Sequence, residues 1–295
     1  MDLTIGPLQF NWPAQQWADF YARIADEAPV DRVVLGELVC SKRLPFYADR
    51  IPDAIERLER GGKQVVLTSL ALVTLPRERR AAAALFEDDA PEVEINDLTL
   101  MRWAGKTRPF SIGPLVNVYN EGTLRFLANK GARSICLPPE LPFASVAGLA
   151  EAARAENVGC EVWAFGRVPL AISGRCYHAR VHGLAKDSCQ FVCDRDPDGL
   201  TVDTLDRQAF LTVNGVQTLS FNCVNLAGDI ASLAGAGVSS LRLSPHSGDF
   251  VRVTKVFRSV LEGRTDGTGV DVELAALGPP MPFSRGFMFG ATGAE

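Results

Sequence analysis

The order and the amino-acid composition of its segments predict that the sequence adopts an α/β fold, a single (β/α)8 TIM-like barrel. Short runs rich in valine, isoleucine and leucine alternate with longer segments of helical pattern, at roughly 30 residues per strand–helix unit. Such continuous apolar runs are typical of strands buried on both faces of a parallel sheet. The length of 295 residues suits one such barrel, and a hydrophobic content of 47% supports a large core.

Nine segments have the pattern of strands, although an eight-stranded barrel has only eight places. They are LTIG (3–6), RVVLGE (32–37), KQVVLTS (63–69), EVEIND (92–97), FSIGPLVNV (110–118), RSICLP (133–138), CEVWAFG (160–166), QTLSF (217–221) and SLRLSP (240–245). Either the N-terminal run or the short QTLSF is expected to be an extra strand outside the barrel. Helices are expected between the strands, over about 14–27, 50–61, 76–90, 97–105, 121–131, 143–157, 226–236 and 249–262.

Glycine and proline residues mark several of these boundaries. Gly61 and Gly62 close the second helix, Pro76 occupies a first helical position, and Gly131 follows a helix end. No G-x-G-x-x-G follows the first strand and no P-loop is present. These absences weaken the alternative of an open nucleotide-binding sheet.

Residues 167–216 interrupt the alternation of strands and helices. This segment holds three of the seven cysteines, two of the three histidines and the turn-rich DRDPDG, and LTVNGVQTL predicts a hairpin around Asn214-Gly215. An irregular insertion of this length in a compact barrel is usually functional. The expected organisation is one barrel domain over residues 1–295, with this insertion and a tail over about 264–295.

The net charge, the N-terminus and the cysteine count indicate which partners and which cellular location to expect. The formal net charge is −5 and no basic stripe is present, which argues against a nucleic-acid partner. The N-terminus lacks the features of a signal peptide, and no apolar run reaches the length of a transmembrane segment. A cytoplasmic protein is therefore expected, and an odd number of cysteines argues against a disulfide framework.

The cysteines of the insertion point to a metal centre. Cys176, Cys189 and Cys193 fall within 18 residues, and a helical turn over the last two would place both on one face. Three thiolates need a fourth ligand, for which Cys40, just past the second strand, is the best candidate and Cys223 the weaker one. The spacing leaves open zinc, an iron–sulfur cluster, or thiols unrelated to a metal.

Four other residues are candidates for binding a substrate. Glu37 ends the second strand and is placed either to orient a substrate or to accept from a loop amide. Asn117 and Asn120 follow the fifth strand at the same face, where asparagines are also ordinary loop residues. Arg242 lies within a strand and needs an anionic partner, either a substrate carboxylate or a side chain such as Glu37 or Glu161. No residue is assigned as a proton-transfer catalyst.

Several motifs together resemble the collagenase-like "U" peptidase family. They are GELVCSKR, KQVVLTSLALV, LVNVYN, EVWAFGRVPLAISGRC and LRLSP, which are spread from residue 36 to residue 245. The signature of this family is matched at Glu161, Trp163, Gly166, Ser173, Gly174 and Cys176. The first cysteine of the signature is replaced by Pro169, and Cys40 supplies the missing ligand. In this departure the chain resembles the UbiV-like branch of the family, which contains the smaller iron–sulfur subunits of oxygen-independent ubiquinone biosynthesis.

The resemblance implies a cofactor, a partner and a reaction. The cofactor is a [4Fe–4S] cluster held by Cys40, Cys176, Cys189 and Cys193. The partner is a UbiU-like subunit in a heterodimer, and the reaction is ring hydroxylation of a ubiquinone precursor without dioxygen. Relatives that hydroxylate RNA bases take their oxygen from prephenate, which is the candidate donor here. The alternatives are such an RNA-base hydroxylase, or a zinc-stabilised protease or structural subunit, although H-E-x-x-H and G-x-S-x-G are absent.

Overall fold

Eight parallel strands form a closed barrel in the computed structural model, which describes residues 1–87, 91–104, 108–278 and 281–290. The strands are β1 (Asp2–Ile5), β2 (Arg32–Leu35), β3 (Gln64–Thr68), β4 (Glu92–Ile95), β5 (Phe110–Ile112), β6 (Ala132–Cys136), β7 (Gly159–Ile172) and β11 (Ser240–Leu243). They pair in this order, and β11 pairs with both β7 and β1, which closes the ring. The predicted (β/α)8 barrel is confirmed.

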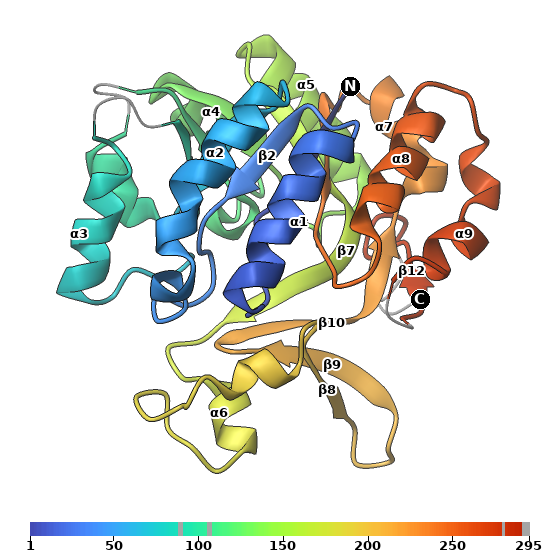
Figure 1. Cartoon of the computed structure of the whole chain (residues 1–295). Coiled ribbons are helices and arrows are strands. Elements are labelled where there is room, and N and C mark those ends of the chain that lie inside the picture. Colours follow the sequence, from blue (N-terminus) through green and yellow to red (C-terminus); the bar gives the residue numbers. More distant parts are fainter. Residues whose placement is uncertain (88–90, 105–107, 279–280, 291–295) are drawn as a thin grey trace.

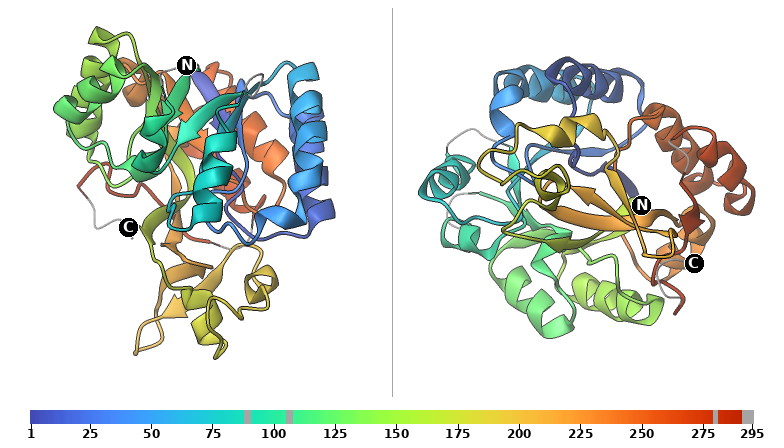
Figure 2. Two further views of the ribbon diagram at one scale, coloured as in Figure 1. Left: turned by 90° about the vertical axis from the view of Figure 1, so that its left-hand side faces the viewer. Right: turned by 90° about the horizontal axis from the view of Figure 1, so that it is seen from below.

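Helices surround the ring of strands (Figures 1 and 2). They are α1 (Ala14–Glu27), α2 (Ile51–Arg60), α3 (Pro76–Ala84), α4 (Glu121–Asn129), α5 (Phe143–Ala155), α7 (Ile230–Gly235) and α8 (Phe250–Leu261). The short 3-10 helices η1 (Leu44–Phe46) and η2 (Ala48–Arg50) lead into α2, and η6 (Ala227–Asp229) leads into α7. Most of these helices bury large side chains against the sheet, such as Trp17, Leu58 and Phe257.

Three segments differ from the sequence prediction. The strand expected over 110–118 ends at Ile112, because Gly113-Pro114 starts the 3-10 helix η4 (Pro114–Val116) and proline cannot donate to the strand ladder. The helix expected over 97–105 is the 3-10 helix η3 (Leu98–Arg102), which Asp97 caps by accepting from the Thr99 amide. The helix expected over 76–90 ends at Ala84. Residues 88–90 and 105 of these predictions lie outside the described residues.

The interior of the barrel is charged. Arg242 on β11 is 1% exposed and pairs with Glu94 on β4 and, at 2.8 Å, with Glu161 on β7. Arg32 on β2 pairs with Glu92 on β4 at 2.7 Å. Because these ion pairs occupy the interior of the barrel, the apolar core lies in the layer between the strands and the helices.

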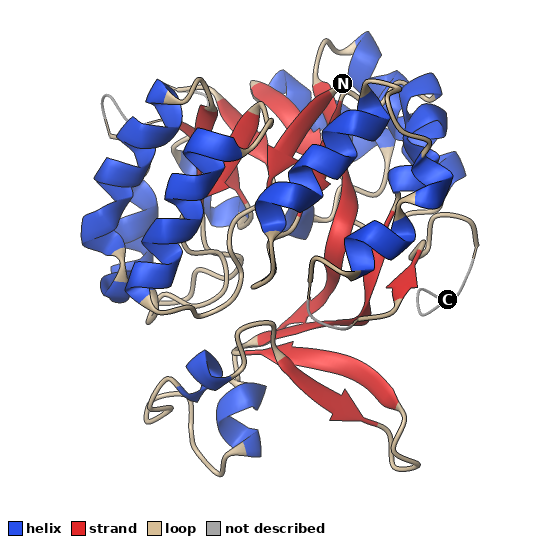
Figure 3. Ribbon diagram, turned by 45° about the vertical axis from the view of Figure 1, so that its right-hand side comes forward, coloured by secondary structure: helices blue, strands red, loops and turns tan. Residues whose placement is uncertain are grey.

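The segment that interrupts the alternation forms a lobe at the carboxyl ends of the barrel strands (Figures 1 and 3). Strand β7 runs out of the barrel into this lobe, which contains α6 (Tyr177–Val181), η5 (Val192–Arg195), β8 (Leu200–Asp203) and β9 (Ala209–Asn214). Strand β10 (Gln217–Asn225) then returns antiparallel to β7. Seen from below, the lobe lies across the end of the barrel (Figure 2). The expected hairpin is present, with Gly215 at φ 64° in its turn.

Strand β10 is the extra strand that the sequence predicted, because it contains QTLSF and lies outside the ring, whereas the N-terminal run is the barrel strand β1. The tail adds η7 (Gly267–Gly269), α9 (Asp271–Ala275) and β12 (Phe283–Ser284), and β12 pairs with β10. The Met288 carbonyl accepts from the Phe143 amide at 2.7 Å, which holds the tail to α5. Among the described helices, none combines the length and apolarity that a bilayer crossing requires.

Candidate functional site

The structure brings four cysteines to one cavity between the barrel and the lobe, called here the thiol cavity. Cys40 comes from the segment after β2, Cys176 from the start of α6, Cys189 from a turn and Cys193 from η5. All four are free thiols. Cys223, the weaker candidate for a fourth ligand, is fully buried on β10 and does not line this cavity.

The link between Cys189 and Cys193 is a turn and not the helical turn that the spacing suggested. Gln190 and Phe191 have φ values of 49° and 55°, in the left-handed region. The Phe191 ring packs edge-on against Phe46 of η1, with ring centroids 4.7 Å apart. The turn is therefore fixed against the barrel while both cysteines still face the thiol cavity.

Glu37 shapes the segment that carries Cys40. Its carboxylate is buried, and one oxygen accepts from the amides of Val39 and Cys40 at 2.8 and 2.9 Å. The other oxygen accepts from the Tyr47 hydroxyl at 2.8 Å. Burial raises the pKa of Glu37, against the lowering effect of Arg43 and of these donors. Of the two roles that the sequence left open for Glu37, the structure shows the bond to loop amides.

The two cations after Cys40 join the barrel to the lobe. Lys42 donates to the carbonyls of Lys186 and Asp187 at 2.8 and 3.3 Å. Arg43 is 1% exposed and donates to the Gln9 carbonyl and to the Asn214 side chain, both at 2.8 Å. Both cations therefore have defined partners, which fixes the position of Cys40 relative to the lobe.

Polar donors surround the thiols. Lys42 Nζ lies 3.4 Å from Cys189 Sγ, Asn11 Nδ2 lies 3.4 Å from Cys193 Sγ, and the Ala179 amide donates to Cys176 Sγ at 3.4 Å. Such contacts stabilise negative charge on sulfur. Sequence analysis missed Asn11, whose only signal is a polar residue in the run that follows β1.

Burial raises the pKa of Cys40 and of Cys176. Burial therefore favours the neutral, protonated form of these two thiols, and binding of a metal would displace their protons. The small apolar cluster of Leu38, Val39 and Val216 packs against the same two cysteines and shields them from solvent. The site therefore has the donor set of a metal centre in a protected position.

A second group of metal-ligating side chains lies beside the thiol cavity. Among the described residues, one group of three has its ligand atoms within 4.8 Å of one another, and it consists of His178, His182 and Asp196. His178 lines the thiol cavity and contacts Asp196 at 2.9 Å, and burial lowers its pKa. The four described thiols form no group this compact, whereas sulfurs on one zinc ion lie about 3.8 Å apart.

The remaining predicted site residues lie elsewhere. Asn120 caps α4 by accepting from the Thr123 amide at 2.9 Å, and Asn117 is an exposed residue with φ 62° after η4. Neither lines the thiol cavity. Arg242 is occupied inside the barrel by Glu161, an alternative that the sequence named, and by Glu94, which it did not.

A comparison with protein families agrees with this architecture and with the motifs in it. The family model described as peptidase family U32 matches residues 15–295, which includes the whole barrel after β1, the lobe and the tail. The matched range also contains all four cysteines of the thiol cavity. The chain belongs to peptidase family U32.

Proposed function

We propose that this protein binds a [4Fe–4S] cluster through Cys40, Cys176, Cys189 and Cys193. The observation that carries the proposal is that these four thiols, from one barrel segment and three places in the lobe, line a single cavity. A cluster with four thiolate ligands fits this donor set, and it spreads its ligands more widely than one zinc ion does. Once bound, the cluster supplies one-electron transfer.

The residues around the thiols suit a centre of negative charge. Lys42, Arg43 and Lys186 line the cavity with the cysteines, and together they offset the charge of the thiolates. Asn11 and the Ala179 amide donate toward sulfur, and Glu37 holds the Cys40 amide. These contacts orient the ligands and limit access of water.

We further infer that the chain acts as the smaller, UbiV-like subunit of a system that hydroxylates the ring of a ubiquinone precursor without dioxygen. Membership of peptidase family U32, the cysteine of GELVCSKR and the replacement of a signature cysteine by Pro169 support this assignment. A UbiU-like chain is the proposed partner and prephenate the candidate oxygen donor. The proposed place of action is the cytoplasm, because an odd number of cysteines argues against a disulfide framework.

The cluster is tested by purification without oxygen, followed by assays of iron and acid-labile sulfide and by visible and EPR spectra. We expect about four irons and four sulfides per chain. Cys40→Ala should lose or degrade the cluster. The matched control is Cys223→Ala, which removes an equally free, buried thiol outside the thiol cavity and should leave the iron content unchanged. Zinc, no metal, or full iron in the Cys40 variant would each reject the proposal.

The reaction is tested separately. The chain and a UbiU-like partner would be expressed in a bacterium that lacks its own pair, grown without oxygen, and ubiquinone would be measured by mass spectrometry. We expect ubiquinone with the wild-type pair and none with Cys40→Ala. A chain that holds the cluster but restores no ubiquinone would rule out this substrate while leaving the metal centre in place.

A further inference from the structure

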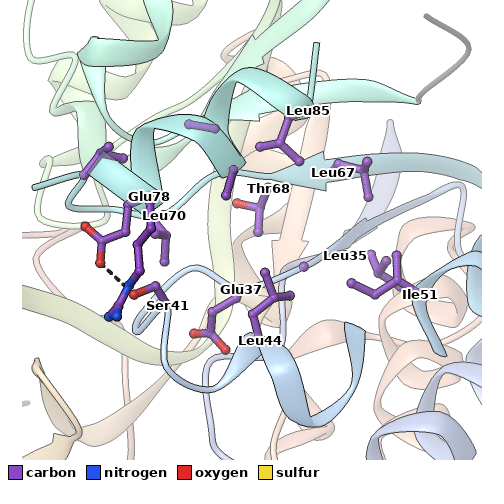
Figure 4. A pocket seen from close by; sticks show the side chains of 15 residues that line it. Leu35, Glu37, Ser41, Leu44, Ile51, Leu67, Thr68, Leu70, Glu78 and Leu85 are labelled. Carbon is purple, nitrogen blue, oxygen red and sulfur yellow. Dashed lines mark hydrogen bonds between the residues drawn. The ribbon is translucent and has the colours of Figure 1, made fainter. Parts of the chain in front are cut away.

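The helix layer of the barrel contains a cavity between α2 and α3, close to the segment of Cys40. This α2–α3 cavity encloses about 270 Å³ and is lined mainly by aliphatic side chains from β2, β3, α2 and α3. Figure 4 shows Leu35, Leu67 and Ile51 at one side of it, with Glu78 and Ser41 at the other. The cavity therefore has an apolar part and a polar part.

The composition of α3 accounts for this space. The helix reads PRERRAAAA, and its buried residues are Glu78 and Ala82, where other helices bury tryptophan, leucine or phenylalanine. In the sheet, Leu67 of β3 is in register with Leu35 of β2 and next to Val93 of β4. Those two neighbours are fully buried, whereas Leu67 is only partly covered. Because apolar voids destabilise a fold, an uncovered strand centre indicates a place that a ligand fills.

The polar part of the cavity contains one charged side chain, Arg77, that has no acidic partner among the described residues. Glu78 is occupied, since one oxygen accepts from Ser41 Oγ at 2.6 Å and the other from the Thr74 and Leu75 amides, both at 2.9 Å. Arg77 also lines the cavity, and its guanidinium pairs with no acidic group among the described residues. A guanidinium beside apolar walls suits a carboxylate on an apolar body.

The α2–α3 cavity leads toward the thiols. A second cavity of about 330 Å³, called here the intermediate cavity, shares Ser41, Arg77 and Glu78 with the α2–α3 cavity. It also shares Cys40 and Lys42 with the thiol cavity. The three cavities therefore adjoin in sequence around the segment from Gly36 to Arg43.

We propose that the α2–α3 cavity binds a monocyclic carboxylate, with its ring among the leucines and its carboxylate at Arg77. An apolar cavity of about 150 Å³ is enough for benzene, so the larger volume here accommodates a ring with a short alkyl chain. This binding site uses none of the four cysteines and so stands without the cluster.

The test is calorimetric titration of the anaerobically purified protein with benzoate, 4-ethylbenzoate and 4-butylbenzoate. We expect one site per chain, with affinity rising up to about fourfold per added methylene, from about 0.8 kcal/mol per buried CH2. Ala82→Leu fills the cavity and should weaken binding at least tenfold without lowering the melting temperature. Its matched control is Ala84→Leu on the exposed face of the same helix, which should bind like the wild type.

The charge is tested by Arg77→Gln, which should weaken the benzoates at least tenfold and leave binding of 4-butylbenzyl alcohol unchanged. Arg80→Gln, an exposed residue of α3 that does not line the cavity, is the control. The proposal is overturned by absence of saturable binding, by equal binding to Ala82→Leu, or by stronger binding of decanoate than of any ring compound. Iron and sulfide measured in the same samples separate this result from the cluster: ring binding without iron leaves the cavity assigned and the cluster rejected.

Discussion

Replacing Glu37 by alanine is predicted to destabilise the protein by about 3 kcal/mol and to displace Cys40. The substitution leaves three donors without their acceptor: the amides of Val39 and Cys40 and the hydroxyl of Tyr47. Each buried donor left unpaired costs about 1–3 kcal/mol. We expect the three costs together to reach only the lower end of their combined range, about 3 kcal/mol. The reason is that removing a buried carboxylate also removes its desolvation cost.

The isosteric variant Glu37→Gln separates shape from charge. Its amide oxygen can still accept from the two main-chain amides, so we expect a loss of about 1 kcal/mol at neutral pH. Burial raises the pKa of Glu37 in the folded protein, so the folded state binds the proton more tightly than the unfolded state. The stability of the wild type relative to Glu37→Gln should therefore be greatest at acidic pH and fall as pH rises through the folded-state pKa.

The assay is urea unfolding followed by circular dichroism, together with the iron content of the same samples. A loss of about 3 kcal/mol corresponds to a drop of about 6–12 °C in melting temperature for a chain of this size. Glu56→Ala, an exposed carboxylate on α2, is the control and should change stability by less than about 0.5 kcal/mol. If Glu37→Ala unfolds within 1 kcal/mol of the wild type and keeps full iron, Glu37 does not position Cys40.

Three further predictions concern the barrel, a histidine and the thiol cavity. Arg242→Met should cost about 3–5 kcal/mol in urea unfolding, because it leaves Glu94 and Glu161 buried without a cation. Burial lowers the pKa of His246 from 6.5 to about 4, so the unfolded chain binds more protons between these values. Its contribution of about 3 kcal/mol should be present above pH 6.5 and lost as pH falls to about 4, and His246→Gln should remove that dependence. Lys42→Met should make the midpoint potential of the proposed cluster more negative in an EPR-monitored redox titration, because the reduced cluster loses a nearby cation.

The results that would contradict these predictions are equally specific. Arg242→Met with wild-type stability would mean that water or rearrangement compensates the two carboxylates. A wild-type pH profile in His246→Gln would assign the acid sensitivity to other groups. A midpoint potential that is unchanged or more positive in Lys42→Met would show that this ammonium group does not act on the centre.

The barrel was predictable because its strands are read from local composition. The run RVVL is buried at every residue and so on both faces, and its pattern does not depend on which strand lies beside it. The meeting of Cys40 with the cysteines of the lobe also followed from topology, since loops at the carboxyl ends of barrel strands converge. The early end of β5 was within reach as well, because Pro114 marks it.

Other features depend on pairs of residues that local patterns do not connect. Nothing in the run around Glu94 shows that it faces Arg242 across the barrel, and Asn11 becomes a neighbour of Cys193 only when the lobe folds back. The α2–α3 cavity was also hidden, because four consecutive alanines predict a good helix and do not show what lies opposite them. Predicting such features requires the register of the strands and the distances between side chains, and local composition gives neither.

The placement of the four thiols has a consequence for the order in which the molecule is made. Strands β3 to β7 lie along the chain between Cys40 and Cys176, so no fragment shorter than most of the barrel contains the full set. Contacts between such distant parts of a chain form late, because the entropy of closing a long loop must first be overcome. The thiol cavity is thus a late product of folding, and a metal that needs all four sulfurs can report that strands β3 to β7 and the lobe have assembled.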